Sequence, residues 1–178
     1  MAWTAPKTWS VGEIVTAANM NLHLRDNLNY LGTKESIWVP VGARWDGTNF
    51  VAIQASDRYA GAALVSATDF AVMGAILIPS DFGALVSAVI VVRPNATQAA
   101  ANWDTYSNYA AVGQSTTTHT GSNTVSTYNV TDGILFAVDV AGILANLAAN
   151  DILGLQLSQA TAAHNVTVLG ARLKYTIA

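Results

Sequence analysis

The sequence contains no cysteine, and only 11% of its residues are charged. The absence of cysteine excludes disulfide bonds, cysteine-ligated metals and cysteine nucleophiles together. An average soluble domain carries about 25% charged residues. A lone monomer that combines so few charges with 52% hydrophobic residues would expose apolar patches to water. We therefore expect much of the surface to be covered by other subunits.

Other absences exclude whole classes of partner. The lysines and arginines form no cluster that would neutralise phosphates, and the net charge is -3, so we expect no nucleic-acid partner. No apolar run approaches the roughly 20 residues of a membrane span, and no basic segment followed by an apolar one indicates a signal peptide. We accordingly expect no membrane partner. The length of 178 residues fits one domain with a short appendage.

No pattern of catalytic or metal-binding residues stands out. The histidines His23, His119 and His164 form no pair at a spacing of two or four, and glutamate occurs only twice, which argues against a cupin-like metal site. Several aspartates lie in predicted turns, where a carboxylate accepts hydrogen bonds from nearby amides: Asp57, Asp69, Asp81, Asp132 and Asp151. A dispersed Ser-His-Asp set is left open, although no Gly-x-Ser-x-Gly elbow is present. We predict a protein that is not an enzyme and needs no cofactor.

The clearest positive signal is an amphipathic helix that begins after Thr16, a favourable N-cap residue. Apolar residues follow at spacings of three and four and form one stripe. The stripe consists of Ala17, Met20, Leu24, Leu28 and Leu31. Gly32 stands where a left-handed C-cap is typical. A helix of about fifteen residues is marginal alone in water, so the stripe predicts docking against another surface.

An extended segment with two tryptophans, Trp3 and Trp9, precedes this helix. Each ring is a large apolar surface that is costly to leave in water. Two interpretations remain open: the segment anchors on a neighbouring subunit or a host lattice, or both rings fold back onto their own domain. We assign assembly and attachment to six residues of this region, which are Trp3, Trp9, Met20, Leu24, Leu28 and Leu31.

From residue 36 onward the composition changes to that of a β domain. Short β-branched and apolar runs recur about every ten residues between turn signals, which is typical of an antiparallel β-sandwich or barrel. The first predicted strand is 37–41, ended by Pro40 and Gly42, and Asp139 is predicted to cap a short helix. The sequence thus predicts an arm and docking helix over 1–35 and a mainly β, jelly-roll-like antiparallel sandwich over 36–178.

A run of aromatic residues gives one candidate ligand site. Trp103, Tyr106 and Tyr109 are interleaved with small and polar residues, and His119 lies in the following polar loop. Aromatic rings bind the apolar faces of sugars while polar loops supply hydrogen bonds. The alternative interpretation is that these rings fill a core or a subunit interface.

The helix region also carries a family resemblance. It resembles the N-terminal motif of small virion proteins of tailed bacteriophages, which are described as minor tail, head-fibre or head-decoration proteins. The matching residues are Trp9, Gly12, Glu13, Thr16, Ala17, Ala18, Met20, Asn21, Arg25, Asp26, Asn27, Leu28 and Leu31. The likeness covers roughly the first fifth of the chain. The segment 134–157 is similar to the late strands of jelly-roll domains in trimeric virion and tumour-necrosis-like proteins.

This resemblance implies a non-enzymatic structural protein of the virion, assembled in the bacterial host cytoplasm. The implied form is a homotrimer that decorates the capsid or forms a short head fibre, with other virion proteins such as the major capsid protein as partners. The alternative is a receptor-binding tail-fibre or minor-tail tip that contacts a host surface glycan through residues 102–124. A β-sandwich module unrelated to phages is a third possibility.

Overall fold

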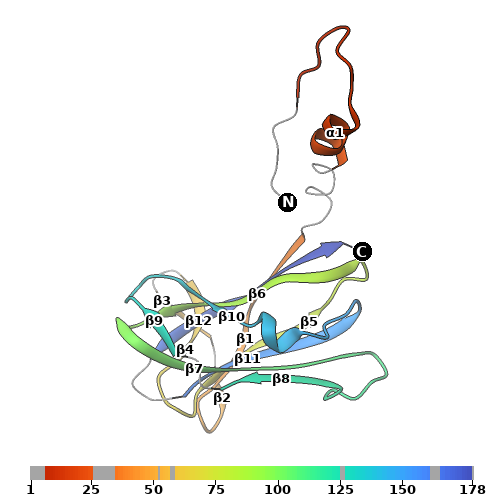
Figure 1. The fold of residues 1–178 in the computed structure, drawn as a ribbon. Helices are drawn as coiled ribbons and strands as arrows, with labels where there is room; N and C mark the ends of the chain where they lie inside the picture. The colour runs from red at the N-terminus through yellow and green to blue at the C-terminus, as the bar shows by residue number, and fades with distance from the viewer. Residues whose placement is uncertain are drawn as a thin grey trace.

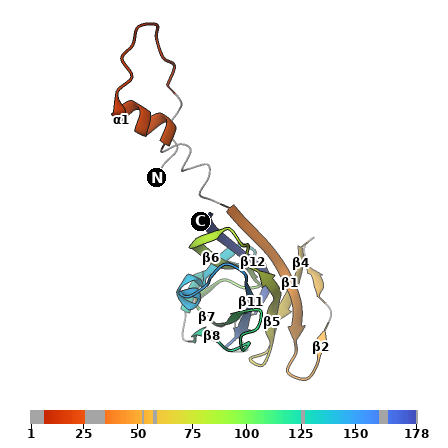
Figure 2. The ribbon, with the colours of Figure 1, turned by 90° about the vertical axis from the view of Figure 1, so that its right-hand side faces the viewer.

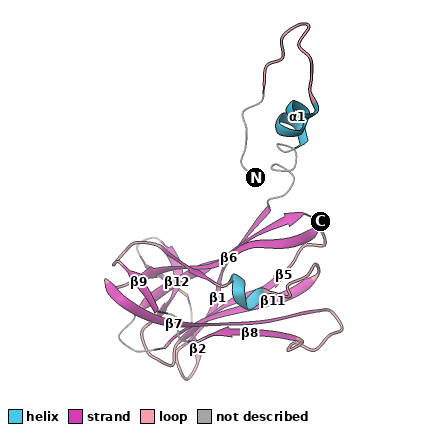
Figure 3. Cartoon of the chain, viewed as in Figure 1, coloured by secondary structure: helices cyan, strands magenta, loops and turns pink. Residues whose placement is uncertain are grey.

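The computed structural model describes residues 7–25, 35–51, 53–56, 59–124, 127–160 and 165–177. These residues form an antiparallel β-sandwich preceded by a short helical segment (Figures 1 and 3). The strands are β1 (Glu35–Trp45), β2 (Phe50–Val51), β3 (Gln54–Ser56), β4 (Tyr59–Leu64), β5 (Phe70–Leu77), β6 (Phe82–Pro94), β7 (Gln98–Ala111), β8 (His119–Asn123), β9 (Thr127–Val130), β10 (Phe136–Asp139), β11 (Asp151–Gln159) and β12 (Val166–Ile177). The predicted mainly β, jelly-roll-like fold class is confirmed.

The pairing of eight of the strands is nested, as in a long hairpin that has been rolled up. β1 pairs with β12, β5 with β11, β6 with β10 and β7 with β8. The order β10-β6-β12-β1 makes the first sheet, and β5-β11-β7-β8 makes the second. Figure 2 shows the two sheets facing each other across the core. This nesting is the arrangement of a jelly roll.

Strand β1 joins the two sheets. Residues 35–40 pair with β12, and from Val41 onward the strand pairs with β5, with a shift of register at Gly42. Pro40 cannot donate a ladder hydrogen bond, and a strand glycine is typical of a bulge. We predicted that Pro40 and Gly42 would end the first strand, and this boundary is wrong: the two residues mark the change of partner, and the strand continues to Trp45.

The core lies between the sheets and is built by alternation. Along β7 and β11 every second residue is buried, which places one face of each strand in the core and the other outside. Large apolar side chains from both sheets meet there, among them Met73, Ile90, Leu155 and Leu173. Each such side chain contributes about 1.5–3 kcal/mol when fully buried. A domain of this size can bury a core large enough to fold without disulfides or metals.

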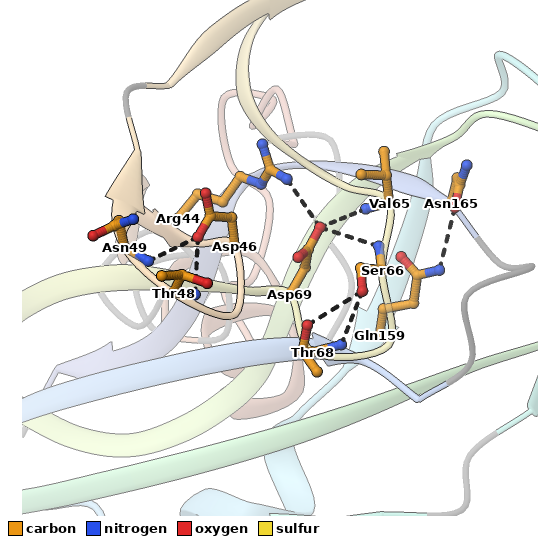
Figure 4. A network of polar contacts seen from close by, with 10 residues as sticks. All are labelled: Arg44, Asp46, Thr48, Asn49, Val65, Ser66, Thr68, Asp69, Gln159 and Asn165. Atoms are coloured by element: carbon orange, nitrogen blue, oxygen red, sulfur yellow. Dashed lines mark hydrogen bonds and ion pairs between the residues drawn. The ribbon is translucent and has the colours of Figure 1, made fainter.

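A buried ion pair fixes the loop between β4 and β5 (Figure 4). The Arg44 side chain donates from Nη2 to Asp69 Oδ2 over 2.9 Å. The same carboxylate oxygen accepts from the amides of Val65, at 2.8 Å, and Ser66, at 3.1 Å. Asp69 is 1% exposed. The predicted turn role of Asp69 is thus confirmed, and the contact with Arg44 ties the turn to β1.

A short 3-10 helix, η2 (Ala141–Leu144), packs beside β8. Asp139 Oδ1 accepts from the Ala141 amide over 2.9 Å, so the carboxylate binds the first amide of η2 from one residue before the N-cap, which is Val140 and not Asp139 as predicted. Gly121 on β8 permits the approach, because a Cβ there would lie 2.4 Å from the Ile143 carbonyl oxygen. Ser107 Oγ donates to that oxygen over 2.9 Å.

Candidate binding surfaces

The N-terminal segment has a small structure of its own. Thr16 caps the helix as predicted, since its hydroxyl accepts from the Asn19 amide over 3.2 Å. The α-helix α1 (Ala17–Met20) is followed by a π-helix, η1 (Asn21–Arg25), a change that the apolar spacing did not predict. The predicted continuation of the helix through Leu28 and Leu31 lies outside the described residues, as does Trp3.

Trp9 is held by residues of the same segment. The Lys7 ammonium lies 4.9 Å from the centre of the Trp9 ring. The His23 ring stands nearly perpendicular to the Trp9 ring, with ring centres 6.4 Å apart. Lys7 also forms an ion pair with Glu13, whose carboxylate accepts from the Ser10 amide over 3.2 Å. These two hydrogen bonds, the Lys7 bond foremost, hold the pKa of Glu13 below its usual value. Trp9 therefore packs within the segment and still leaves 38% of its surface exposed.

Residues 7–25 are the described part of the predicted arm and docking helix, and from here on we call this part the arm. Its large apolar side chains are exposed. Figures 1 and 2 show it standing clear of the sandwich. Met20 and Leu24, the described part of the predicted stripe, are both exposed. Four more exposed apolar residues accompany them: Val11, Ile14, Val15 and Leu22. So many exposed apolar side chains on one short segment indicate a docking surface.

The structure does not bring the four candidate ligand residues together. Trp103 is buried and stacks on Tyr128, with ring centres 5.6 Å apart. Tyr109 is also buried; it stacks on His119 at 5.1 Å, and its hydroxyl accepts from the Asn146 amide. Tyr106 lies on the opposite face of β7 and lines a surface hollow. Three of the four thus serve packing, and Tyr106 alone faces a hollow.

The hollow beside Tyr106 belongs to a trough along the outside of the second sheet. Its polar end has a volume of about 460 Å³. The side chains that define this end are Tyr106, Asn108, Thr120, Ser122 and Gln156. Its apolar end, of about 520 Å³, includes Val72, Ala75, Ala110, Val112 and Ile152. No residue that lines either end is charged.

Exposed apolar residues border the apolar end of the trough. Leu77 on β5 and Ile152 on β11 are directly opposite each other, and they are 65% and 41% exposed. Val112, in the turn after β7, is 86% exposed. The outer face of the first sheet differs: Arg172 and Lys174 on β12 are exposed there, with Trp38 opposite Arg172. The second sheet thus presents the less charged outer face.

Asn108, Thr120 and Ser122 lie within the predicted region 102–124, but sequence reasoning did not single them out. It missed Gln156, because this residue lies on β11 and no short motif links it to the region. The isolated Gly154 within a strand-like run was a usable signal.

Comparisons with protein families, curated proteins and solved structures found no match. Within the described ranges, no set of three or more acidic or histidine side chains is placed to hold a metal ion. The described part of the chain also has no helix with the length and apolarity of a membrane span.

Proposed function

We propose that this chain is a non-enzymatic structural protein of a tailed phage particle, a homotrimer that decorates the capsid or forms a short head fibre. The observation that carries the proposal is the arm, an exposed apolar segment attached to a sandwich with its own complete core. In this proposal, the arm attaches the protein to the particle and the β domain joins the subunits. The phage assignment itself rests on the residues of the N-terminal motif.

The chemistry of the arm supports attachment to another protein. Trp9 is positioned by Lys7 and His23, so that it meets a partner as an ordered ring. Pre-ordered aromatic anchors surrounded by apolar residues are typical of the residues that dominate binding energy in interfaces. Other virion proteins, the major capsid protein above all, are the proposed partners of this surface.

The apolar end of the trough is the proposed contact between subunits. Leu77, Val112 and Ile152 would be covered there by a second copy of the chain. A copy of the same chain fits because the lining is uncharged, so that bringing subunits together leaves no unpaired charge buried. The low charge of the whole sequence leads to the same expectation.

The attachment role of the arm predicts the behaviour of a double variant, Met20→Asp with Leu24→Asp. Both side chains are exposed, so the sandwich should keep its melting temperature, while two carboxylates in an apolar contact should prevent incorporation into particles. The measurement is the copy number per purified particle. The control is Val86→Asp, which alters an exposed apolar residue of β6 and should incorporate normally. Normal incorporation of the double variant would refute the attachment role.

A second candidate function, a receptor- or glycan-binding tip, is favoured by one observation. The polar end of the trough offers amide, hydroxyl and phenol groups around a hollow of about 460 Å³, within the roughly 300–1,000 Å³ of typical small-ligand sites. A protein of this kind can both assemble on a particle and bind a sugar, so the two functions are compatible.

A further inference from the structure

The polar end of the trough contains five polar side chains that face solvent. Gln156, Tyr106 and Ser122 lie side by side across β11, β7 and β8, and Asn108 lies opposite Thr120 in the next row. No hydrogen bond joins any of these five side chains to another residue that the structure describes. The two amides and three hydroxyls can each both donate and accept.

The floor of the trough contains a glycine that packing does not require. A Cβ on Gly154 would meet only the Asn108 carbonyl oxygen, at 3.7 Å, which is an ordinary contact. Glycine weakens a strand interior, and it often marks a bulge or a place that a ligand or another backbone approaches closely. Gly121 differs, because its missing side chain is explained by η2. Gly154 also lies at the shift of register between β11 and β5, where a strand glycine is typical, and its missing side chain leaves this part of the surface open.

The uncharged lining restricts the chemical class of ligand that fits the trough. Because no lysine, arginine or histidine lines the trough, a phosphate, sulfate or carboxylate would find no cation there. A fully apolar ligand would bury the amides of Asn108 and Gln156 without partners, at a cost in free energy. Hydroxyl groups match both requirements, since they are neutral and both donate and accept.

We propose that the polar end of the trough binds a neutral saccharide. The amides of Asn108 and Gln156 would bond sugar hydroxyls, and the half-buried Tyr106 ring would contact an apolar sugar face. Gly154, which lines the adjoining part of the trough, would admit the sugar ring close to the strand. This site differs from the Trp103, Tyr109 and His119 group, whose rings pack inside the domain or against one another. It names the ligand class of the second candidate function and rests on that candidate, and it does not depend on the structural role.

The test begins with the full-length chain on a printed array of neutral, sialylated and sulfated glycans. We expect binding to a subset of the neutral glycans. Calorimetry with the best of these should then show at least about a tenfold loss of affinity in Asn108→Ala with Gln156→Ala, because two hydrogen bonds are removed. Asn146→Ala, which removes an exposed amide outside the trough, should bind as the wild type does.

A second variant, Gly154→Val, fills the floor of the trough with a residue that favours strands. It should lose binding while its melting temperature stays equal or rises. An array with no bound neutral glycan would overturn the proposal, and so would binding that both variants leave unchanged. A loss of binding that is accompanied by a lower mass in light scattering would also overturn the proposal, because Gly154 lines the apolar end, where the subunit contact is proposed. None of these outcomes depends on incorporation into particles, so the structural role is tested separately.

Discussion

Replacing Asp69 with alanine should lower the free energy of unfolding by about 3–5 kcal/mol, the typical cost of breaking a buried ion pair by removing one partner. Asp69 Oδ2 accepts from Arg44 and from two amides of the loop that precedes β5. Without the carboxylate, the Arg44 guanidinium stays largely buried beside empty space and both amides lose their acceptor. Urea unfolding followed by circular dichroism measures the loss.

Two further variants test this explanation. Asp139→Ala removes another carboxylate that accepts from a backbone amide, but one that is exposed, and it should cost only about 1 kcal/mol or less. Adding Arg44→Met to Asp69→Ala should restore part of the lost stability, because the buried charge is then absent. If the double variant is as unstable as the sum of the single variants, the two residues do not act as a pair.

Replacing Trp103 with alanine should also cost about 3–5 kcal/mol, the usual loss when a buried tryptophan is truncated. Trp103 is 1% exposed and stacks on Tyr128, with Phe136 6.3 Å away between ring centres. The cavity left behind lies where β7, β9 and β10 meet. Thermal unfolding should show a melting temperature lower by roughly 6–20 °C for a domain of this size.

The matched control is Trp38→Ala on β1. Trp38 is 51% exposed, so its removal should change the free energy of unfolding by less than about 1 kcal/mol. An equal loss in both variants would contradict the assignment of Trp103 to the core. The result also bears on ligand binding: a Trp103 variant that loses binding would do so by unfolding, and Asn108 and Gln156 are the informative positions.

Local signals in the sequence predicted local structure well. Thr16 is the predicted helix N-cap, and Asp69 accepts amide hydrogen bonds in a turn as expected. Pro40 and Gly42 were recognised as interruptions, yet their effect was predicted wrongly. Proline and glycine occur both where a strand ends and where it changes partners, because each place tolerates a missing hydrogen-bond donor or a bulge. The pairing of residues 41–45 with β5 shows that this strand changes partners and does not end.

The candidate site required information from distant parts of the chain. Along β7, the two-residue period of a strand places Trp103 and Tyr109 on one face and Tyr106 on the other. That period alone separates Tyr106 from the other rings, although it does not say which face is buried. Gln156 and Thr120 reach the same trough only because β11 and β8 flank β7. Such neighbours follow from jelly-roll nesting, which no spacing within one segment reveals.

The molecule combines a sandwich that folds around its own core with an apolar arm that the described residues leave uncovered. Our central claim is that the β domain joins the subunits and the arm is free to hold the particle. Light scattering on the full chain, and on a shortened chain that begins at Ser36, tests it most directly. We predict the mass of three chains in both cases. The mass of a single chain in both would contradict self-assembly, and a trimer that becomes a monomer on shortening would assign the subunit contact to the arm.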